Sequence, residues 1–65
     1  SGKGLLLDRM RAEWLEMPGM RLTAAQAARL WALDRIACDS ALAVLVQARF
    51  LIRTPRGAYL LRDGK

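Results

Sequence analysis

The chain has 65 residues, of which 54% are hydrophobic, and it carries a formal net charge of +5. This length predicts one small domain that buries only about 60% of its unfolded surface, without room for a separate catalytic scaffold. One cysteine and no histidine exclude an internal disulfide, a Cys/His zinc site and any catalytic pair that needs histidine.

Residues 5–16 are expected to form the first helix. Apolar side chains recur there at helical spacing and predict a buried face made of Leu7, Met10, Trp14 and Met17. Pro18-Gly19 should end this helix, because the residue before a proline avoids the α region and glycine tolerates positive φ. Met20-Arg21-Leu22 is then expected to be a short extended link with at most one rung of sheet.

The second helix is expected to begin after Thr23. Thr23 and Gln26 fit a capping box, in which each side chain accepts a hydrogen bond from the other residue's free backbone N–H. The helix should run for two to three turns. The residues expected to face inward on it are Ala27, Leu30 and Trp31.

The third helix is predicted from Arg35, with Asp34 as its N-cap. Apolar residues at spacings of three and four predict a buried stripe made of Cys38, Ala41, Leu42 and Leu45. The helix should end near Ala48 or Arg49, because the residues that follow favour strand.

A β-hairpin is predicted at the end of the chain. Phe50–Arg53 and Ala58–Leu61 are rich in residues that favour strands. The turn between them is Thr54-Pro55-Arg56-Gly57. Pro55 presets φ for the second turn position, and Gly57 can take the left-handed position of a bulged hairpin.

Helix, turn, helix and hairpin in this order resemble the winged helix-turn-helix superfamily of bacterial regulators. Thr23–Trp31 resembles the supporting helix, Arg35–Gln47 the recognition helix, Ala48–Leu51 the start of the wing and Gly57–Tyr59 its return. Closer similarity is to short, uncharacterised bacterial winged-helix proteins. They share the run Arg11–Thr23, the early cysteine of the third helix and a Thr-x-x-Gly-x-Tyr wing, here Thr54–Tyr59.

The resemblance covers roughly residues 5–62. It implies a small three-helix α+β domain over residues 4–62, with a C-terminal two-stranded β-hairpin as its wing, and a role in binding DNA. Residues 1–3 and 63–65 are expected to be flexible ends. Arg49 departs from the family pattern, because glycine is common at this junction. A left-handed helix cap at Arg49 should therefore be strained or absent.

Cations accumulate toward the C-terminus and favour an anionic partner, with nucleic acid first and acidic lipid or protein second. In a winged helix, Arg53 and Arg56 on the wing would meet DNA phosphates, and Arg29 on the second helix would do the same. The alternative is a solvated hairpin whose arginines prevent edge-to-edge pairing of sheets.

The third helix offers few side chains for reading bases. The candidates are Arg35 for guanine, Gln47 for adenine and Ser40 for a base or a phosphate. Asp34 and Asp39 would repel the DNA backbone. The apolar residues Ile36, Ala37 and Ala43 suit contact with a protein or with thymine methyl groups, so we expect weak sequence specificity.

Other conspicuous residues are better explained by structure than by function. Trp14 and Trp31 have the helical spacing of core residues rather than of base-stacking platforms. Cys38 lies on an apolar stripe, which favours a buried thiol over a redox sensor. The acidic residues suit caps and surface charges, so neither a catalytic site, a cofactor nor a small-molecule substrate is expected.

No segment reaches the ~18 apolar residues of a membrane span, and Leu5-Leu6-Leu7 is too short for a signal-peptide core. A lone thiol suits a reducing cytoplasm. The preferred interpretation is a cytoplasmic, non-catalytic DNA-binding protein of the transcription-regulator or nucleoid-associated type. A homodimer would raise its modest affinity, with candidate contacts at Leu5, Leu6 and Met10. The alternative is a protein-interaction module that uses Ile36, Ala37, Ala43 and Val46.

Overall fold

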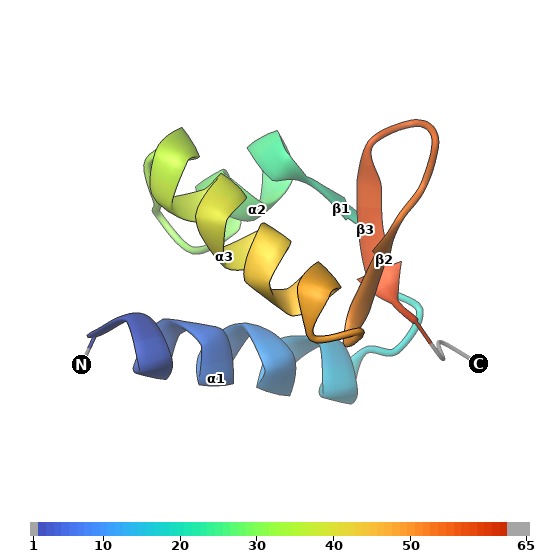
Figure 1. Cartoon of the computed structure of the whole chain (residues 1–65), viewed down its shortest axis with the longest axis horizontal. Helices are drawn as coiled ribbons and strands as arrows, with labels where there is room; N and C mark the ends of the chain where they lie inside the picture. Colours follow the sequence, from blue (N-terminus) through green and yellow to red (C-terminus); the bar gives the residue numbers. More distant parts are fainter. Residues whose placement is uncertain (1, 63–65) are drawn as a thin grey trace.

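Three helices and a three-stranded antiparallel sheet make up residues 2–62, the part of the chain that the computed structural model describes. The elements form a small α+β domain with α3 in contact with α1, α2 and β2 (Figure 1). In chain order they are α1 (Gly2–Glu16), β1 (Leu22–Thr23), α2 (Ala24–Leu30), α3 (Arg35–Gln47), β2 (Leu51–Arg53) and β3 (Ala58–Leu61).

Helix α1 begins at Gly2, three residues earlier than the expected start at residue 5. The expectations for residues 1 and 63–65 lie outside the described residues. Met10 and Trp14 are fully buried, as predicted, but Met17 is 58% exposed. The prediction for Met17 was wrong: α1 ends at Glu16, and the Met17 side chain just beyond that end lies on the surface instead of in the core. Trp14 Nε1 donates to the Met20 carbonyl at 3.1 Å and ties the following loop to α1.

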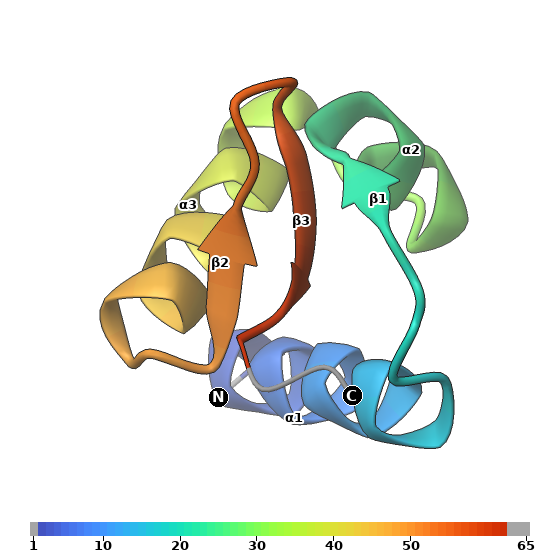
Figure 2. The same ribbon diagram turned by 90° about the vertical axis from the view of Figure 1, so that its right-hand side faces the viewer.

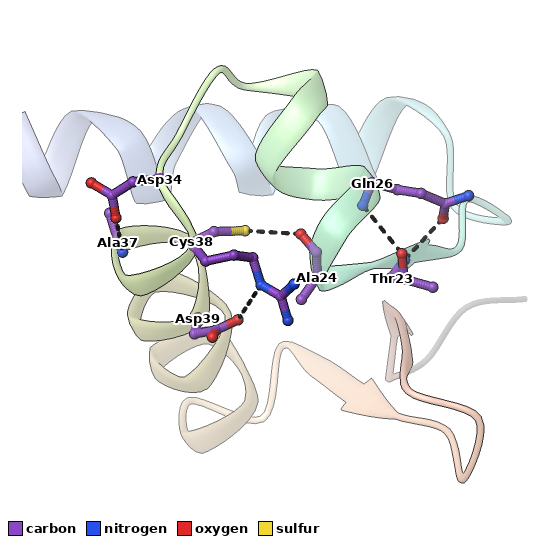
Figure 3. Close-up of polar contacts among 8 residues, drawn as sticks. Thr23, Ala24, Gln26, Asp34, Ala37, Cys38 and Asp39 are labelled. Carbon is purple, nitrogen blue, oxygen red and sulfur yellow. Dashed lines mark hydrogen bonds and ion pairs between the residues drawn. The ribbon is translucent and has the colours of Figure 1, made fainter.

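The N-terminal caps of α2 and α3 form as the sequence predicts. Thr23 Oγ1 accepts from the Gln26 N–H at 3.1 Å, and Gln26 Oε1 accepts from the Thr23 N–H at 3.0 Å, which completes the capping box (Figure 3). Asp34 Oδ1 accepts from the Ala37 N–H at 2.7 Å. These bonds satisfy N–H groups that have no partner inside the helix.

Both α2 and α3 end in a left-handed residue that is not glycine. Ala32 has φ 53° and Arg49 has φ 62°. In each turn the following residue donates back to the helix: Leu33 N–H to the Ala28 carbonyl at 2.8 Å, and Phe50 N–H to the Leu45 carbonyl at 3.0 Å. This is the hydrogen-bond pattern of a Schellman motif. The left-handed cap at Arg49 is therefore present, and its Cβ makes that backbone costly.

The predicted hairpin forms, but it belongs to a sheet of three strands and not two. The strand order is β1-β3-β2, so β1 lies on the other side of β3 from β2 (Figure 2). Leu22 of β1 pairs with Tyr59, and Leu51 of β2 pairs with Leu61. The extended link before α2 thus contributes an edge strand, which the sequence indicated only as a single rung.

The core lies between α3, the other two helices and the inner face of the sheet. Its buried members on α3 are those predicted from the sequence: Cys38, Ala41, Leu42 and Leu45. The rings of Trp14 and Trp31 meet at a centroid distance of 5.5 Å, which identifies both as core residues. Leu30, expected to face inward, is 50% exposed, because Ala27, Ala28 and Trp31 already occupy the side of α2 that faces the core. Within residues 2–62, no helix has the length and apolarity needed to cross a membrane.

Candidate nucleic-acid interface

A hollow of about 420 Å³ separates the hairpin turn from the N-terminal ends of α2 and α3. In both ribbon views the hairpin turn and the N-terminal ends of α2 and α3 lie on the side of the domain away from α1 (Figures 1 and 2). Three arginines from distant parts of the sequence converge on it, two from the hairpin and one from α3. The residues that line the hollow are Thr23, Ala24, Ala25, Arg35, Asp39, Arg53, Arg56, Gly57 and Tyr59.

The register of the hairpin directs Arg53 into the hollow. Alternate residues of a strand share a face, so Arg53 lies on the same side of β2 as the buried Leu51. Arg53 pairs with Tyr59, which is partly buried against the core. The inner face of the sheet thus carries the apolar Leu51 against the core and, two residues further along β2, the cationic Arg53 that lines the hollow.

The turn that carries Arg56 is held by three hydrogen bonds. The Gly57 N–H donates to the Thr54 carbonyl at 2.9 Å, the Thr54 N–H donates to the Ala58 carbonyl at 2.8 Å, and the Ala58 N–H donates to Thr54 Oγ1 at 3.1 Å. Gly57 has φ 85°, which confirms the predicted left-handed position. The hydrogen bonds fix the backbone on both sides of Arg56, so its guanidinium extends from an ordered turn.

Helix α3 contributes both a cation and an anion to the hollow. Arg35 is the first residue of the helix and Asp39 follows one turn later. Arg35 Nε lies 3.5 Å from Asp39 Oδ1, and more than half of each side chain is exposed. Among the described residues that line the hollow, Asp39 is the one acid. The site therefore combines three guanidinium groups with one carboxylate.

The remaining predicted binding residues lie outside this hollow. Ser40 and Gln47 are exposed on α3, where they share an outer stripe with Ile36 and Ala43 at spacings of four, three and four residues. Arg29 is exposed on α2 and lines a second hollow of about 480 Å³ with Leu22, Gln26 and Leu30. The structure thus brings together three of the six predicted residues, and leaves the others on neighbouring surface.

Among the residues of the hollow that sequence reasoning did not assign to a site, Thr23 and Tyr59 have polar side chains. Tyr59 was identified only as a strand residue, although the turn at Thr54–Gly57 sets its pairing with Arg53 and so signals its position. Thr23 reaches the hollow because β1 pairs with β3, opposite Ala58. That contact joins segments far apart in the chain, and no local pattern indicates it.

Cys38 precedes Asp39 on α3 and lies on the buried side of that helix. Its side chain is fully buried, and Sγ donates to the Ala24 carbonyl of α2 at 3.4 Å (Figure 3). Burial raises the pKa of the Cys38 thiol; the Asp39 carboxylate also raises it, and Arg35 opposes both. A neutral, enclosed thiol is a poor nucleophile. The predicted burial is confirmed, and Cys38 links α3 to α2.

Two of the candidate dimer contacts are not free on the surface. Met10 is fully buried, so its proposed role was wrong: the apolar face of α1 that carries it packs into the core. Leu6 is also packed partly against the core, whereas Leu5 is 72% exposed. A dimer contact through α1 would therefore begin at Leu5 without Met10.

In comparisons with known proteins, no protein-family model, curated protein or solved structure matches this chain. Residues 4–39 hold five arginines and five acids, whereas residues 40–62 hold four arginines and no acid. The positive charge of the described chain is thus concentrated in and around the hairpin. Within the same residues, no cluster of side chains suited to holding a metal ion is found.

Proposed function

We propose that the chain is a winged helix-turn-helix domain, with α3 as the recognition helix and the β2–β3 hairpin as its wing. Three features support this assignment. The elements follow one another as helix, strand, two helices and a hairpin. Only residues 31–34 separate α2 from α3. The short strand β1 joins the hairpin beside β3. The last feature extends the resemblance beyond the two-stranded wing expected from the sequence.

The function that this surface supports best is non-catalytic binding of duplex DNA. The observation that carries the proposal is the convergence of Arg35, Arg53 and Arg56 on one hollow between α3 and the hairpin. Guanidinium groups bind phosphate oxygens through paired N–H donors, and phosphate contacts provide most of the affinity for DNA. A hairpin beside a helix spaces these contacts along the DNA backbone.

Base recognition on this surface should be weak. The outer stripe of α3 offers two polar side chains, Ser40 and Gln47, and the apolar Ile36 and Ala43. Two polar side chains discriminate few base pairs, and Ile36 and Ala43 favour only thymine methyl groups. Arg29 would reach the backbone beside α2. We therefore propose a bacterial, cytoplasmic regulator or nucleoid-associated factor that needs a second module or copy for a specific site.

A salt titration with random duplex DNA tests the proposal. For wild-type protein, log affinity should fall linearly with log salt concentration, with a slope of about 0.9 for each phosphate contact. Changing Arg53→Gln and Arg56→Gln together should lower that slope by up to about 2 and weaken all duplexes alike. Arg9→Gln with Arg11→Gln is the matched control, because it removes two cations from α1, on the far side of the domain. An equal loss in both variants would show only an effect of net charge.

A protein-interaction module is the second candidate, favoured by the 81% exposure of Ile36. Ile36 borders a shallow hollow of about 490 Å³ with Asp34, Arg35 and Ala37. Val46, expected to extend this patch, is packed partly against the core. This candidate would be favoured if the chain associated with a partner protein with an affinity that does not depend on salt concentration, and if it bound no duplex DNA at low salt.

A further inference from the structure

The carboxylate of Asp39 stands inside the cationic hollow, where a DNA phosphate would have to come close to it. We propose that Asp39 competes with phosphate for Arg35: it holds Arg35 while the site is empty and lowers the affinity for every DNA sequence. This inference rests on the proposed DNA-binding function. It assigns Asp39 the part of an affinity-limiting residue and Arg35 that of a phosphate-binding residue rather than a base reader.

The geometry favours competition over permanent pairing. The closest approach joins Arg35 Nε to Asp39 Oδ1 at 3.5 Å, longer than a good charged hydrogen bond. Arg35 also carries four N–H donors on its two terminal nitrogens, and within residues 2–62 its ion pair is with Asp39. The side chains are 61% and 55% exposed, so solvent screens their attraction. An exposed pair of this kind changes an equilibrium constant by less than about fivefold.

A bound phosphate meets stronger partners than Asp39 does. It faces Arg53 and Arg56 as well as Arg35, so it can draw Arg35 away from the carboxylate. The carboxylate stays attached to α3 and repels the phosphate, because no cation on the outer stripe of that helix offsets it. Repulsion of the backbone acts on all sequences equally. A base-reading aspartate would instead accept from cytosine N4 and favour particular sequences.

The structure supplies a matched control for this test. Asp8 on α1 forms an exposed ion pair with Arg11, also at 3.5 Å and also within one helical turn. Asp8→Asn and Asp39→Asn each remove one negative charge and one such pair. α1 lies on the far side of the domain from the hollow (Figure 2). Any difference between the two variants in DNA binding therefore reports the position of the charge and not its removal.

Salt titrations with several unrelated duplexes should separate the variants. Asp39→Asn should tighten binding to every duplex by about three- to tenfold and steepen the salt slope by up to about 0.9, one additional phosphate contact. Asp8→Asn should change the affinity much less. In an Arg35→Gln background, the gain from Asp39→Asn should be smaller, because only the relief of direct repulsion between the carboxylate and the phosphate remains. All three side chains are exposed, and thermal unfolding would check that each variant remains folded.

Three outcomes overturn the inference while DNA binding stands. They are an equal gain from Asp8→Asn, an undiminished gain without Arg35, and a loss of affinity restricted to certain sequences. The last would identify Asp39 as a base reader. Absence of duplex binding by wild-type protein at low salt would overturn the inference and the proposed function together.

Discussion

The two faces of α3 differ in what they contribute to the protein. The inner face lies at the centre of the core. Its residues Cys38, Ala41, Leu42 and Leu45 have at most 1% of their surface exposed. The outer face carries exposed polar, charged and apolar residues, and Ile36 among them is 81% exposed. Substitutions inside should therefore change the free energy of unfolding and leave the surface intact, whereas substitutions outside should change binding alone. Substitutions on each face can measure how far stability and binding are separated between them.

The largest effect is expected from the inner face. Leu42→Ala should lower the free energy of unfolding by about 2–5 kcal/mol, because it removes buried methyl groups and leaves a cavity between α3 and its neighbours. Denaturant titration measures this change. Ser40→Ala, on the outer face of the same helix, is the control and should lie within about 0.5 kcal/mol of wild type. Comparable losses from both would erase the distinction between the faces.

Cys38 tests whether a thiol on the inner face behaves as a core residue. Cys38→Ser should destabilise the protein by about 1–3 kcal/mol, because a hydroxyl is costlier to bury than a thiol. A thiol reagent should label native wild-type protein slowly and denatured protein quickly. Equal labelling rates would contradict burial.

The same thiol should make stability depend on alkaline pH. Its pKa is raised by burial above the ordinary value of 9.0, so the unfolded chain loses this proton first. The contribution of Cys38 to the free energy of unfolding is fully present below pH 9.0. It is lost as the pH rises toward the pKa that the thiol has in the folded protein. Cys38→Ala should show a smaller decline over that interval, measured by denaturant titration at several pH values.

The hairpin turn extends the comparison to the wall opposite α3. Gly57→Val should destabilise the protein by about 1–2 kcal/mol, because a β-branched residue is strained at φ 85°. No heavy atom lies within 4 Å of a Cβ built at Gly57, so the cost comes from the backbone and not from a clash. Weaker DNA binding should accompany it, because the turn carries Arg56. Unchanged stability, with amide shifts confined to residue 57, would contradict the ordered turn.

Much of this architecture follows from local signals. Thr23 with Gln26 and Asp34 mark helix starts, and Gly57 marks the turn, because each satisfies the backbone within a few residues. The pairing of Leu22 with Tyr59 is different, since it joins distant segments and depends on how α2 packs. The exposure of Leu30 is similarly decided by which side of α2 meets α3.

The candidate site also has features that local sequence signals predict and others that depend on tertiary structure. Its arginines were identified singly from charge and from the resemblance of the chain to winged helices. Their convergence with Asp39 depends on the position of the hairpin beside the N-terminal end of α3. At Arg49, local sterics argued against the left-handed backbone that the structure adopts. The hydrogen bond from Phe50 to Leu45 and the start of β2 require that turn, so tertiary structure outweighs the local preference.

The smallest predicted effect lies at the end of α3, at Arg49. This residue has both a left-handed backbone and an exposed positive charge. Arg49 has φ 62°, which disfavours any residue with a Cβ. Arg49→Gly should therefore stabilise the protein by about 0.5–1 kcal/mol, after allowing for the greater freedom of glycine in the unfolded chain. Arg49→Ala removes the same charge but keeps the Cβ, so it should leave stability nearly unchanged.

Ala32→Gly completes the comparison, because Ala32 has φ 53° at the end of α2 and no charge. It should gain stability as Arg49→Gly does and, under the proposed DNA-binding function, keep the affinity of the wild type. Arg49→Gly and Arg49→Ala should share any loss of DNA affinity, since both lack the guanidinium. Denaturant titration and salt-dependent DNA binding on the three variants measure the two properties separately. If Arg49→Ala stabilised the protein as much as Arg49→Gly, repulsion among the hairpin arginines would be the source of strain, and the backbone would not.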